Sequence, residues 1–246
     1  MSHHIVEAVS LEYTYPDGTK ALDGINFKII HGESVGIVGA NGAGKSTMLL
    51  LLNGCLTPSS GFVRIGDFPL TDKTVKDVRK RVGTIFQDPD DQLFMPTVYD
   101  DVAFGPLNMG IPIEEVKNRV ETALAMVDAI HLKNRPPYRL SGGQKKAVAI
   151  ATVLSMTPDI LLLDEPSSGL DPKSRRQLID WLKSFHHTKI IATHDLDLVL
   201  DVCERTIVIN DGRVAADGNT HDIFSDTMLL EVNHLEKPLS MQIKST

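Results

Sequence analysis

The 246-residue sequence is poor in cysteine and has no long apolar run. Its two cysteines, Cys55 and Cys203, lie far apart and form no CxxC pair. We therefore expect neither a disulfide scaffold nor a structural zinc site, and a reducing cytosol suits the chain. The longest apolar runs, such as residues 48–52 and 160–163, are far shorter than the roughly 20 residues that cross a bilayer. Residues 1–4 lead into no apolar segment, so we expect no secretion signal.

Positive charge is also in short supply, because 25 lysines and arginines face 32 aspartates and glutamates, for a formal net charge of −7 at pH 7. Proteins that bind nucleic acid normally carry a basic excess or a basic stripe, and this sequence has neither. The same deficit argues against electrostatic attraction to anionic lipid. We therefore expect no nucleic-acid partner.

Short apolar segments alternate with segments of helical periodicity through most of the chain. Strands are expected at 5–13, 25–30, 34–38, 61–65, 82–86, 160–163, 189–192 and 206–209, and helices after Lys45 and at 114–127, 141–154, 174–185 and 196–202. Strands that alternate with helices indicate an α/β fold with a largely parallel sheet.

Two segments depart from this α/β alternation. Between residues 87 and 113, prolines at 89, 96, 106 and 112 predict a loop-rich stretch. The helices at 114–127 and 141–154 follow it, and we interpret the whole segment from Gln87 to about Met156 as a helical insertion. From about Asp226 a polar tail closes the chain, and its pattern leaves open whether the tail is ordered.

A glycine-rich segment follows the strand expected at 34–38. The pattern G-x-x-x-x-G-K-[ST] is matched by Gly39-Ala40-Asn41-Gly42-Ala43-Gly44-Lys45-Ser46, and Thr47 follows. Glycines let the backbone curl so that successive N–H groups point inward, and the following helix adds its positive N-terminal end. Lys45 is expected to bridge the β- and γ-phosphates, and the Ser46 hydroxyl to bind Mg²⁺. The segment therefore predicts a site for ATP and Mg²⁺.

The apolar strand at 160–163 ends in two adjacent acids, Asp164 and Glu165. A buried strand would deliver Asp164 beside the phosphates, where it can hold a Mg²⁺-bound water. Glu165, one residue further, can polarise an attacking water as a general base. Adjacent acids at a strand end can also be merely solvated, but the phosphate-binding segment upstream favours the catalytic interpretation.

Residues 140–144 read Leu-Ser-Gly-Gly-Gln. Ser141 and Gln144 have the S-x-x-Q spacing of a capping box, which by itself predicts a well-capped helix start. Gly142 and Gly143 in addition leave this helix end bare enough for a phosphate to approach closely. Because the chain already has one phosphate loop, this second anion site is expected to serve the ATP of a partner subunit.

These segments together make the chain similar to the ATPase subunits of ABC transporters over about residues 5–225. The stretch 140–144 matches the family's LSGGQ signature. Other family elements occur in the family's order: an adenine-stacking aromatic at Tyr15, the Q-loop glutamine at Gln87, a D-loop that ends at Asp171, and a switch histidine at His194. Each of these residues alone has an ordinary structural explanation, so their order carries the resemblance.

The resemblance implies the fold and the site residues. The fold is a P-loop NTPase α/β core with a parallel central sheet, an antiparallel β subdomain and an inserted α-helical subdomain. The ATPase domain spans 1–225, with the helical subdomain at about 88–157 and a C-terminal tail at 226–246. The implied catalytic residues are Glu165, His194 and Gln87, the Mg²⁺ ligands are Ser46, Gln87 and Asp164, and the nucleotide contacts are Tyr15, Gly39, Asn41, Gly42, Ala43, Gly44, Lys45, Ser46, Thr47, Ser141, Gly142, Gly143, Gln144 and Asp171.

The resemblance also implies a mechanism. Two subunits, most simply two copies of this chain, face head to tail and sandwich two ATPs, each between the Lys45 loop of one subunit and residues 141–144 of the other. ATP binding closes the dimer, and hydrolysis by Glu165 with His194 reopens it. The chain departs from many relatives at Ala147, where they carry arginine three positions after the signature glutamine. This departure bears on an ion pair between segments and not on nucleotide binding.

Residues 15–22 and 86–94 resemble the ATPases of energy-coupling factor importers, most closely those of the cobalt/nickel (CbiO-like) group. This implies two further partners, a transmembrane scaffold protein and a membrane substrate-binding subunit, and a peripheral place on the cytoplasmic face of the cell membrane. One alternative is an ABC transporter with conventional permeases. A second, a non-transport relative acting in DNA repair or on ribosomes, fits less well, because the segment between Lys45 and Leu140 leaves no room for a long coiled coil and the chain holds one cassette.

Overall fold

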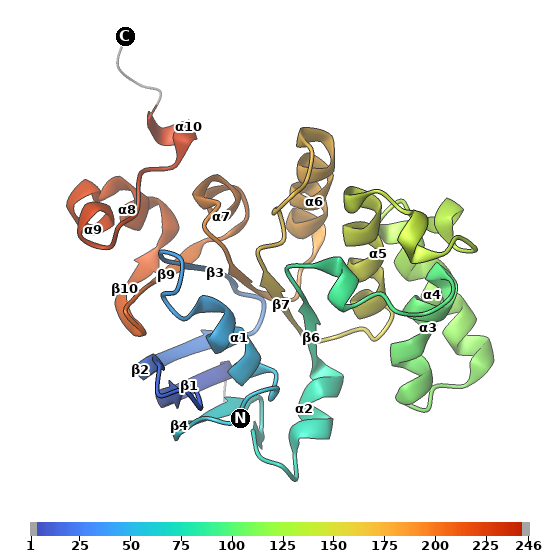
Figure 1. Cartoon of the computed structure of the whole chain (residues 1–246), viewed down its shortest axis with the longest axis horizontal. Coiled ribbons are helices and arrows are strands. Elements are labelled where there is room, and N and C mark those ends of the chain that lie inside the picture. The colour runs from blue at the N-terminus through green and yellow to red at the C-terminus, as the bar shows by residue number, and fades with distance from the viewer. Residues whose placement is uncertain (1–3, 243–246) are drawn as a thin grey trace.

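Two β-sheets form the framework of the protein in the computed structural model, which describes residues 4–242 (Figure 1). The larger sheet is six-stranded with the order β10-β9-β3-β8-β7-β6. Its strands from β9 to β6 run parallel, and β10 pairs antiparallel with β9 at one edge. The strands are β3 (Ser34–Val38), β6 (Val82–Ile85), β7 (Ile160–Asp164), β8 (Thr188–Ala192), β9 (Arg205–Asn210) and β10 (Arg213–Asn219).

The smaller sheet is antiparallel and has the order β2-β1-β4-β5. From Gly24 onward, exposed and buried residues alternate along β2, as expected of a strand with one face on a core and one in water. The expected fold, with a parallel central sheet and an antiparallel β subdomain, is confirmed. The strands are β1 (His4–Thr14), β2 (Lys20–Ile30), β4 (Ser60–Ile65) and β5 (Phe68–Pro69).

A helix, α1 (Lys45–Leu52), lies between the two sheets and buries Met48, Leu49, Leu51 and Leu52 in the core that they share (Figure 1). Ile160 and Leu162 of β7 join that core, whereas Leu161 and Leu163 belong to the core on the opposite face. Successive side chains of a strand point to opposite faces, so β7 is buried on both sides. This double burial explains why its sequence is an unbroken apolar run.

The opposite face of the larger sheet is covered by α6 (Pro172–Ser184) and α7 (Leu196–Val202), and three helices pack together beside it (Figure 1). These are α3 (Val98–Asn108), α4 (Ile113–Met126) and α5 (Gly142–Leu154), and they contact one another through apolar faces. They lie within the segment interpreted as a helical insertion, whose boundaries at about 88 and 157 stay a prediction. A short helix, α2 (Val75–Arg81), precedes β6.

The expectation of a loop-rich stretch between residues 87 and 113 is wrong for α3. Thr97 caps this helix by accepting a hydrogen bond from the Asp100 N–H at 3.2 Å. Pro106 lies inside the helix and has no N–H to donate to the carbonyl of Val102, four residues earlier. The Ser155 hydroxyl, just beyond α5, donates to that carbonyl at 2.8 Å. A donor distant in the sequence thus supplies the hydrogen bond that Pro106 cannot make.

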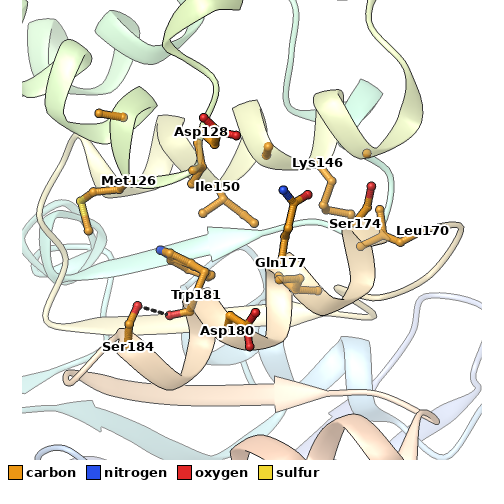
Figure 2. A pocket seen from close by; sticks show the side chains of 15 residues that line it. Met126, Asp128, Lys146, Ile150, Leu170, Ser174, Gln177, Asp180, Trp181 and Ser184 are labelled. Atoms are coloured by element: carbon orange, nitrogen blue, oxygen red, sulfur yellow. Dashed lines mark hydrogen bonds between the residues drawn. The ribbon is translucent and has the colours of Figure 1, made fainter. Parts of the chain in front are cut away.

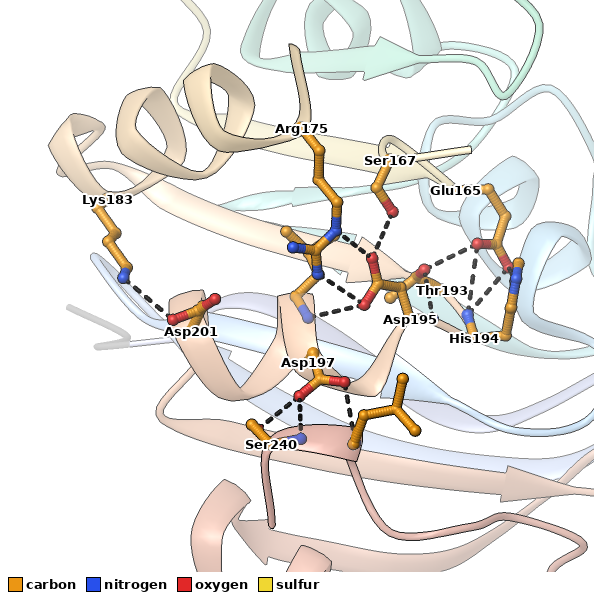
Figure 3. Close-up of polar contacts among 12 residues, drawn as sticks. Glu165, Ser167, Arg175, Lys183, Thr193, His194, Asp195, Asp197, Asp201 and Ser240 are labelled. Carbon is orange, nitrogen blue, oxygen red and sulfur yellow. Dashed lines mark hydrogen bonds and ion pairs between the residues drawn. The ribbon is translucent and has the colours of Figure 1, made fainter. Parts of the chain in front are cut away.

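The tail after Asp226 is ordered through the described residues. Leu230 is 1% exposed and joins the same core as Phe224. Further along, the N–H groups of Leu239 and Ser240 donate to the Asp197 carboxylate at 3.0 and 3.1 Å (Figure 3). The C-terminal segment is therefore anchored at the start of α7, and its helices are α8 (Thr220–Ser225), α9 (Thr227–Val232) and α10 (Leu239–Gln242).

We expect Leu230→Ala to lower the free energy of unfolding by about 2–4 kcal/mol, because it removes a buried side chain and leaves a cavity. The control is Met228→Ala on the same helix, where the side chain is 76% exposed and the change should stay within about 0.5 kcal/mol. Urea denaturation of the two variants measures the difference. A Leu230 variant as stable as the wild type would show that α9 does not pack on the core in solution.

None of the helices within residues 4–242 is long and apolar enough to cross a membrane. Cys55 is exposed, whereas Cys203 is buried beside α7. Burial raises the pKa of the Cys203 thiol to about 12. Cys203 therefore stays a protonated, unreactive part of the core at neutral pH.

Candidate active site

The glycine-rich segment 39–46 connects the end of β3 to the start of α1. A Cβ atom at Gly39 would lie 2.2 Å from the carbonyl oxygen of Ile209 in β9. Gly44 has a φ of +104°, and a Cβ atom there would lie 2.6 Å from the carbonyl oxygen of Ala21 in β2. The loop therefore packs so closely against both sheets that only glycine fits at these positions. It places the N-terminal end of α1 where an anion can bind.

The Lys45 side chain folds back over this loop. Its ammonium donates hydrogen bonds to the carbonyl oxygens of Gly39 at 2.8 Å and Ala40 at 3.1 Å. Burial lowers the pKa of Lys45, and the negative charges of Glu165 and Asp164 act in the opposite direction. A buried ammonium with a main-chain tether and two nearby carboxylates is well prepared to pair with phosphate oxygens.

A cleft of about 520 Å³ brings most of the predicted site residues together. The hydroxyls of Tyr15 and Thr47 lie 2.8 Å apart on its wall. Gly39 and Ala43 belong to the same loop without lining this cleft. The predicted residues that line it are Tyr15, Asn41, Gly42, Gly44, Lys45, Ser46, Thr47, Gln87, Glu165 and His194.

Asp164, at the end of β7, has the features of a metal ligand. Its Oδ1 atom is buried and has no hydrogen-bond partner within residues 4–242. Burial raises the pKa of Asp164, although a hydrogen bond with the Ser46 hydroxyl opposes the rise. An unpartnered carboxylate oxygen next to a serine hydroxyl matches the oxygen ligands that Mg²⁺ prefers. Asp164, Ser46 and Gln87 all line one neighbouring cleft. Together these three residues therefore fit a Mg²⁺ ion.

The Glu165 carboxylate is held by the segment that follows β8 (Figure 3). It accepts hydrogen bonds from the Thr193 hydroxyl at 2.7 Å and the His194 N–H at 3.1 Å, and its Oε1 lies 2.9 Å from His194 Nδ1. The Glu165 backbone has a φ of +42°, a left-handed conformation that costs a residue other than glycine about 1–3 kcal/mol. Such strain occurs where surrounding contacts aim a side chain, and here they aim the carboxylate into the cleft.

Asp195 holds this segment in place from behind (Figure 3). Its carboxylate accepts hydrogen bonds from Arg175 at 2.9 and 3.0 Å and from the Ser167 hydroxyl at 2.9 Å. Burial alone would raise the pKa of Asp195, but the hydrogen bonds from Arg175, the Leu198 N–H and Ser167 together hold it below its usual value. The positions of Thr193 and Glu165 thus depend on an ion pair with α6.

Thr193 and Asp195 were not among the residues predicted from the sequence. A signal for them was available, because both are polar residues next to His194, directly after a strand whose residues are all buried. Their partners were not visible, because Glu165 and Arg175 are distant in the sequence and approach only in the folded chain.

Ser141 and Gln144 form the expected capping box at the start of α5. Ser141 N–H donates to Gln144 Oε1 at 3.0 Å, and the Gln144 N–H donates to Ser141 Oγ at 3.4 Å. Within one chain this helix start does not line the cleft that holds Lys45. Gly142 instead lines the neighbouring cleft, of about 640 Å³, together with Ser46, Gln87 and Asp164.

Asp171 lies at the N-terminus of α6, where it acts as the helix cap. Its carboxylate accepts hydrogen bonds from the Ser174 hydroxyl at 2.6 Å and from the N–H groups of Lys173 and Ser174 at 3.0 and 3.1 Å. The side-chain hydrogen bond from Ser174 lowers the pKa of Asp171 most. The structure therefore explains this residue as a helix cap, and its expected contact with nucleotide stays a prediction.

Ala147 faces a cleft of about 370 Å³ between α5 and α6 (Figure 2). Ile150, Trp181 and Gln177 line the same cleft. The indole N–H of Trp181 is buried without a hydrogen-bond partner among the described residues. The small side chain at 147 thus leaves open space between the two helices.

The sequence profile of the family described as ABC transporter matches residues 22–168, more than half of the chain. A relative from Geobacter sulfurreducens, named provisionally as an ABC transporter ATP-binding protein, is 65% identical over 242 residues, which cover 98% of this chain and 97% of the relative. The energy-coupling factor transporter ATP-binding protein EcfA of Methanocaldococcus jannaschii is 47% identical over 240 residues, which cover 96% of this chain and 86% of EcfA.

Solved structures of ABC transporter proteins also match this chain. CbiO1 from Clostridium perfringens, described as part of the ABC transporter complex CbiONQ, superposes with a TM-score of 0.83 at 43% identity and covers 94% of both chains. An ATP-binding cassette solved as a dimer in a post-hydrolysis state with ADP and Pi superposes with a TM-score of 0.79 at 31% identity, covering 87% of this chain and 98% of that one.

Proposed function

We propose that this chain, which belongs to the ABC transporter family and is the ATPase subunit that binds ATP for a transporter, powers an energy-coupling factor importer. The proposed cargo of that importer is cobalt or nickel ions. The observation that carries the ATPase part is the shared cleft, in which Lys45 and Ser46 of α1 converge with Glu165 after β7 and His194 after β8, three segments in all. The similarity to EcfA and CbiO1 over nearly the whole chain supports the type of importer.

In this proposal the cleft binds ATP with its phosphates on the glycine-rich loop. Tyr15 stacks on the adenine, Lys45 pairs with the β- and γ-phosphates, and the N-terminus of α1 adds its positive end. Ser46, Asp164 and Gln87 would hold Mg²⁺, which supplies positive charge against the phosphate oxygens when bound. The orphaned Oδ1 of Asp164 supports this assignment.

Glu165 acts as the general base in the proposed reaction. Its carboxylate accepts the proton of the attacking water while the water oxygen bonds to the γ-phosphorus and the bond to the β-phosphate oxygen breaks. Thr193 and the His194 N–H orient the carboxylate through the hydrogen bonds described above. The His194 ring is 65% exposed, so it can approach the γ-phosphate from the cleft wall.

The signature residues serve a second subunit in this proposal. Ser141, Gly142, Gly143 and Gln144 would contact the ATP held by the Lys45 loop of the partner, so that two copies of the chain form two identical sites across one isologous interface. The dimeric post-hydrolysis neighbour supports such a pairing. A homodimer is proposed because this chain carries every element of one site.

The proposed partners in the membrane are a small transmembrane scaffold protein and a separate substrate-binding subunit, with this chain at the cytoplasmic face as a peripheral subunit. An alternative is a transporter with two conventional permeases. Affinity capture of tagged Glu165→Gln protein from native membranes with ATP distinguishes them. The proposal expects a scaffold protein and a metal-binding membrane subunit, followed by ATP-dependent uptake of radiolabelled Co²⁺ or Ni²⁺ by vesicles that contain the complex.

Other outcomes of this capture count against the proposal. Two conventional permeases would establish the alternative, and soluble or ribosomal partners alone would exclude a transporter. A captured importer that moves neither Co²⁺ nor Ni²⁺ would leave the importer type standing and overturn the choice of ion.

A further inference from the structure

Lys146, in the first turns of α5, is a lysine buried inside the protein. Only 2% of it is exposed, and its ammonium donates hydrogen bonds to the carbonyl oxygens of Gln87 at 2.7 Å and Phe86 at 3.2 Å. Burial lowers the pKa of Lys146, and the negative charges of Asp88 and Asp164 oppose this effect. Burying an ammonium group costs free energy unless the group is paired and hydrogen-bonded. The two main-chain carbonyls offset part of this cost, which indicates that Lys146 has a role at Gln87.

Lys146 is supported by other contacts between the same two segments. The Gln92 amide donates to the carbonyl of Ala149 at 2.8 Å and to the Thr152 hydroxyl at 2.7 Å. The Gln92 side-chain oxygen accepts a hydrogen bond from the Phe86 N–H at 3.3 Å. The segment 86–92 is thereby attached to α5 at both of its ends, and Lys146 makes the attachment at Gln87.

The same helix carries the signature residues. The capping box of Ser141 and Gln144 forms the start of α5, and Lys146 lies within one turn of it. Gln87 lines both the cleft that holds Lys45 and the neighbouring cleft that holds Asp164. Lys146 therefore connects two places. One is the main chain of Gln87, beside the chain's own nucleotide cleft, and the other is the start of α5, which would face the nucleotide of the partner subunit.

We propose that Lys146 is a positioning residue, whose ammonium fixes the main chain at Gln87 to the start of α5 so that the Gln87 side chain is held at the metal position. This inference rests on the proposed function, in which Gln87 is a Mg²⁺ ligand. Its consequence is that Gln87 and the signature residues move as one unit. When Gln87 shifts at the chain's own nucleotide, residues 141–144 therefore shift with it, and their position against the partner's nucleotide changes.

The test is Lys146→Met, which keeps most of the side-chain volume and removes the ammonium. We expect the Mg²⁺ concentration for half-maximal ATPase rate to rise about tenfold, the usual effect of losing a residue that orients a metal ligand. Binding of fluorescent ATP without Mg²⁺ should stay within about threefold of the wild type, because the Lys45 loop is untouched. Lys146→Arg, which can still donate to both carbonyls, should restore most of the Mg²⁺ response.

The matched control is Lys145→Met, at the next position of the same helix. Lys145 pairs with the Asp90 carboxylate at 2.6 and 2.8 Å, and that carboxylate is 61% exposed, so the pair contributes little. This variant should keep the wild-type Mg²⁺ response. Melting temperatures of both variants show whether the fold is intact.

A double-mutant cycle separates positioning from general loss of structure. In the Gln87→Ala background, Lys146→Met should have no further effect on the Mg²⁺ response, because the side chain that it positions is gone. Additive effects, or a Lys146→Met response equal to that of the wild type, would overturn the inference while the ATPase assignment stands. A wild-type protein without Mg²⁺-dependent ATPase activity would overturn the proposed function and this inference with it.

Discussion

Glu165→Gln lowers the rate of ATP hydrolysis by about 10²–10⁴-fold, the typical contribution of a positioned general base. The amide has nearly the shape of the carboxylate, and its oxygen can still accept the hydrogen bonds from Thr193 and the His194 N–H, but it cannot take a proton from water. ATP binding needs no proton transfer, so the variant should bind ATP as the wild type does. The bound state then persists, and we expect a closed dimer to accumulate.

Single-turnover hydrolysis measures the rate, and size-exclusion chromatography with ATP measures the dimer. The control is Glu231→Gln, an exposed glutamate on α9 whose change should leave both unaffected. A Glu165→Gln protein that hydrolyses ATP at the wild-type rate would show that the general base is a different residue.

Lys45→Met weakens ATP binding by about 100-fold, or ~2.7 kcal/mol, because the variant loses a charge-assisted contact with the phosphates. The wild-type ammonium lies buried, donating to the carbonyls of Gly39 and Ala40, and the methionine side chain fills nearly the same space. Titration with a fluorescent ATP analogue measures the affinity. Lys73→Met, at an exposed position that does not line the cleft, is the control and should bind normally.

The melting temperature without nucleotide shows whether the Lys45 variant is folded. Burial lowers the pKa of Lys45, which means that its charged form is disfavoured in the folded protein. Replacing it by methionine should therefore leave the melting temperature unchanged or raise it, while the stabilisation by added ATP is lost. Tight ATP binding by the variant would contradict the role given to the 39–46 loop.

The local motifs were readable from the sequence because their chemistry is contained in a few neighbouring residues. The loop at 39–46 needs its glycines for close approach to β2 and β9, and the capping box at Ser141 needs only Gln144 three residues on. Asp164 ends β7 and Glu165 follows it, and the apolar run before them already indicates burial on both faces. Each of these features is defined by residues a few positions apart, so it can be recognised without knowledge of the tertiary structure.

The prediction of a loop-rich stretch was wrong at α3. Pro106 argues against a helix, since proline lacks the N–H that a helix interior needs. The Ser155 hydroxyl satisfies the carbonyl left free at Val102, but it comes from a segment about fifty residues later. The ordered tail depends in the same way on Asp197, which receives the N–H groups of Leu239 and Ser240.

The sequence by itself determined the α/β class, the ATP-binding loop and the adjacent acids, because each follows from periodicity or from residues within one short segment. Only the tertiary structure decided how Glu165 is aimed, through Thr193 and His194, and how Gln87 is fixed to α5, through Lys146. The physical reason is the order of the strands in the larger sheet, where β7 lies beside β8 and β6 although long segments separate them in the chain. Hydrogen bonds between the ends of such strands form only once the sheet is assembled.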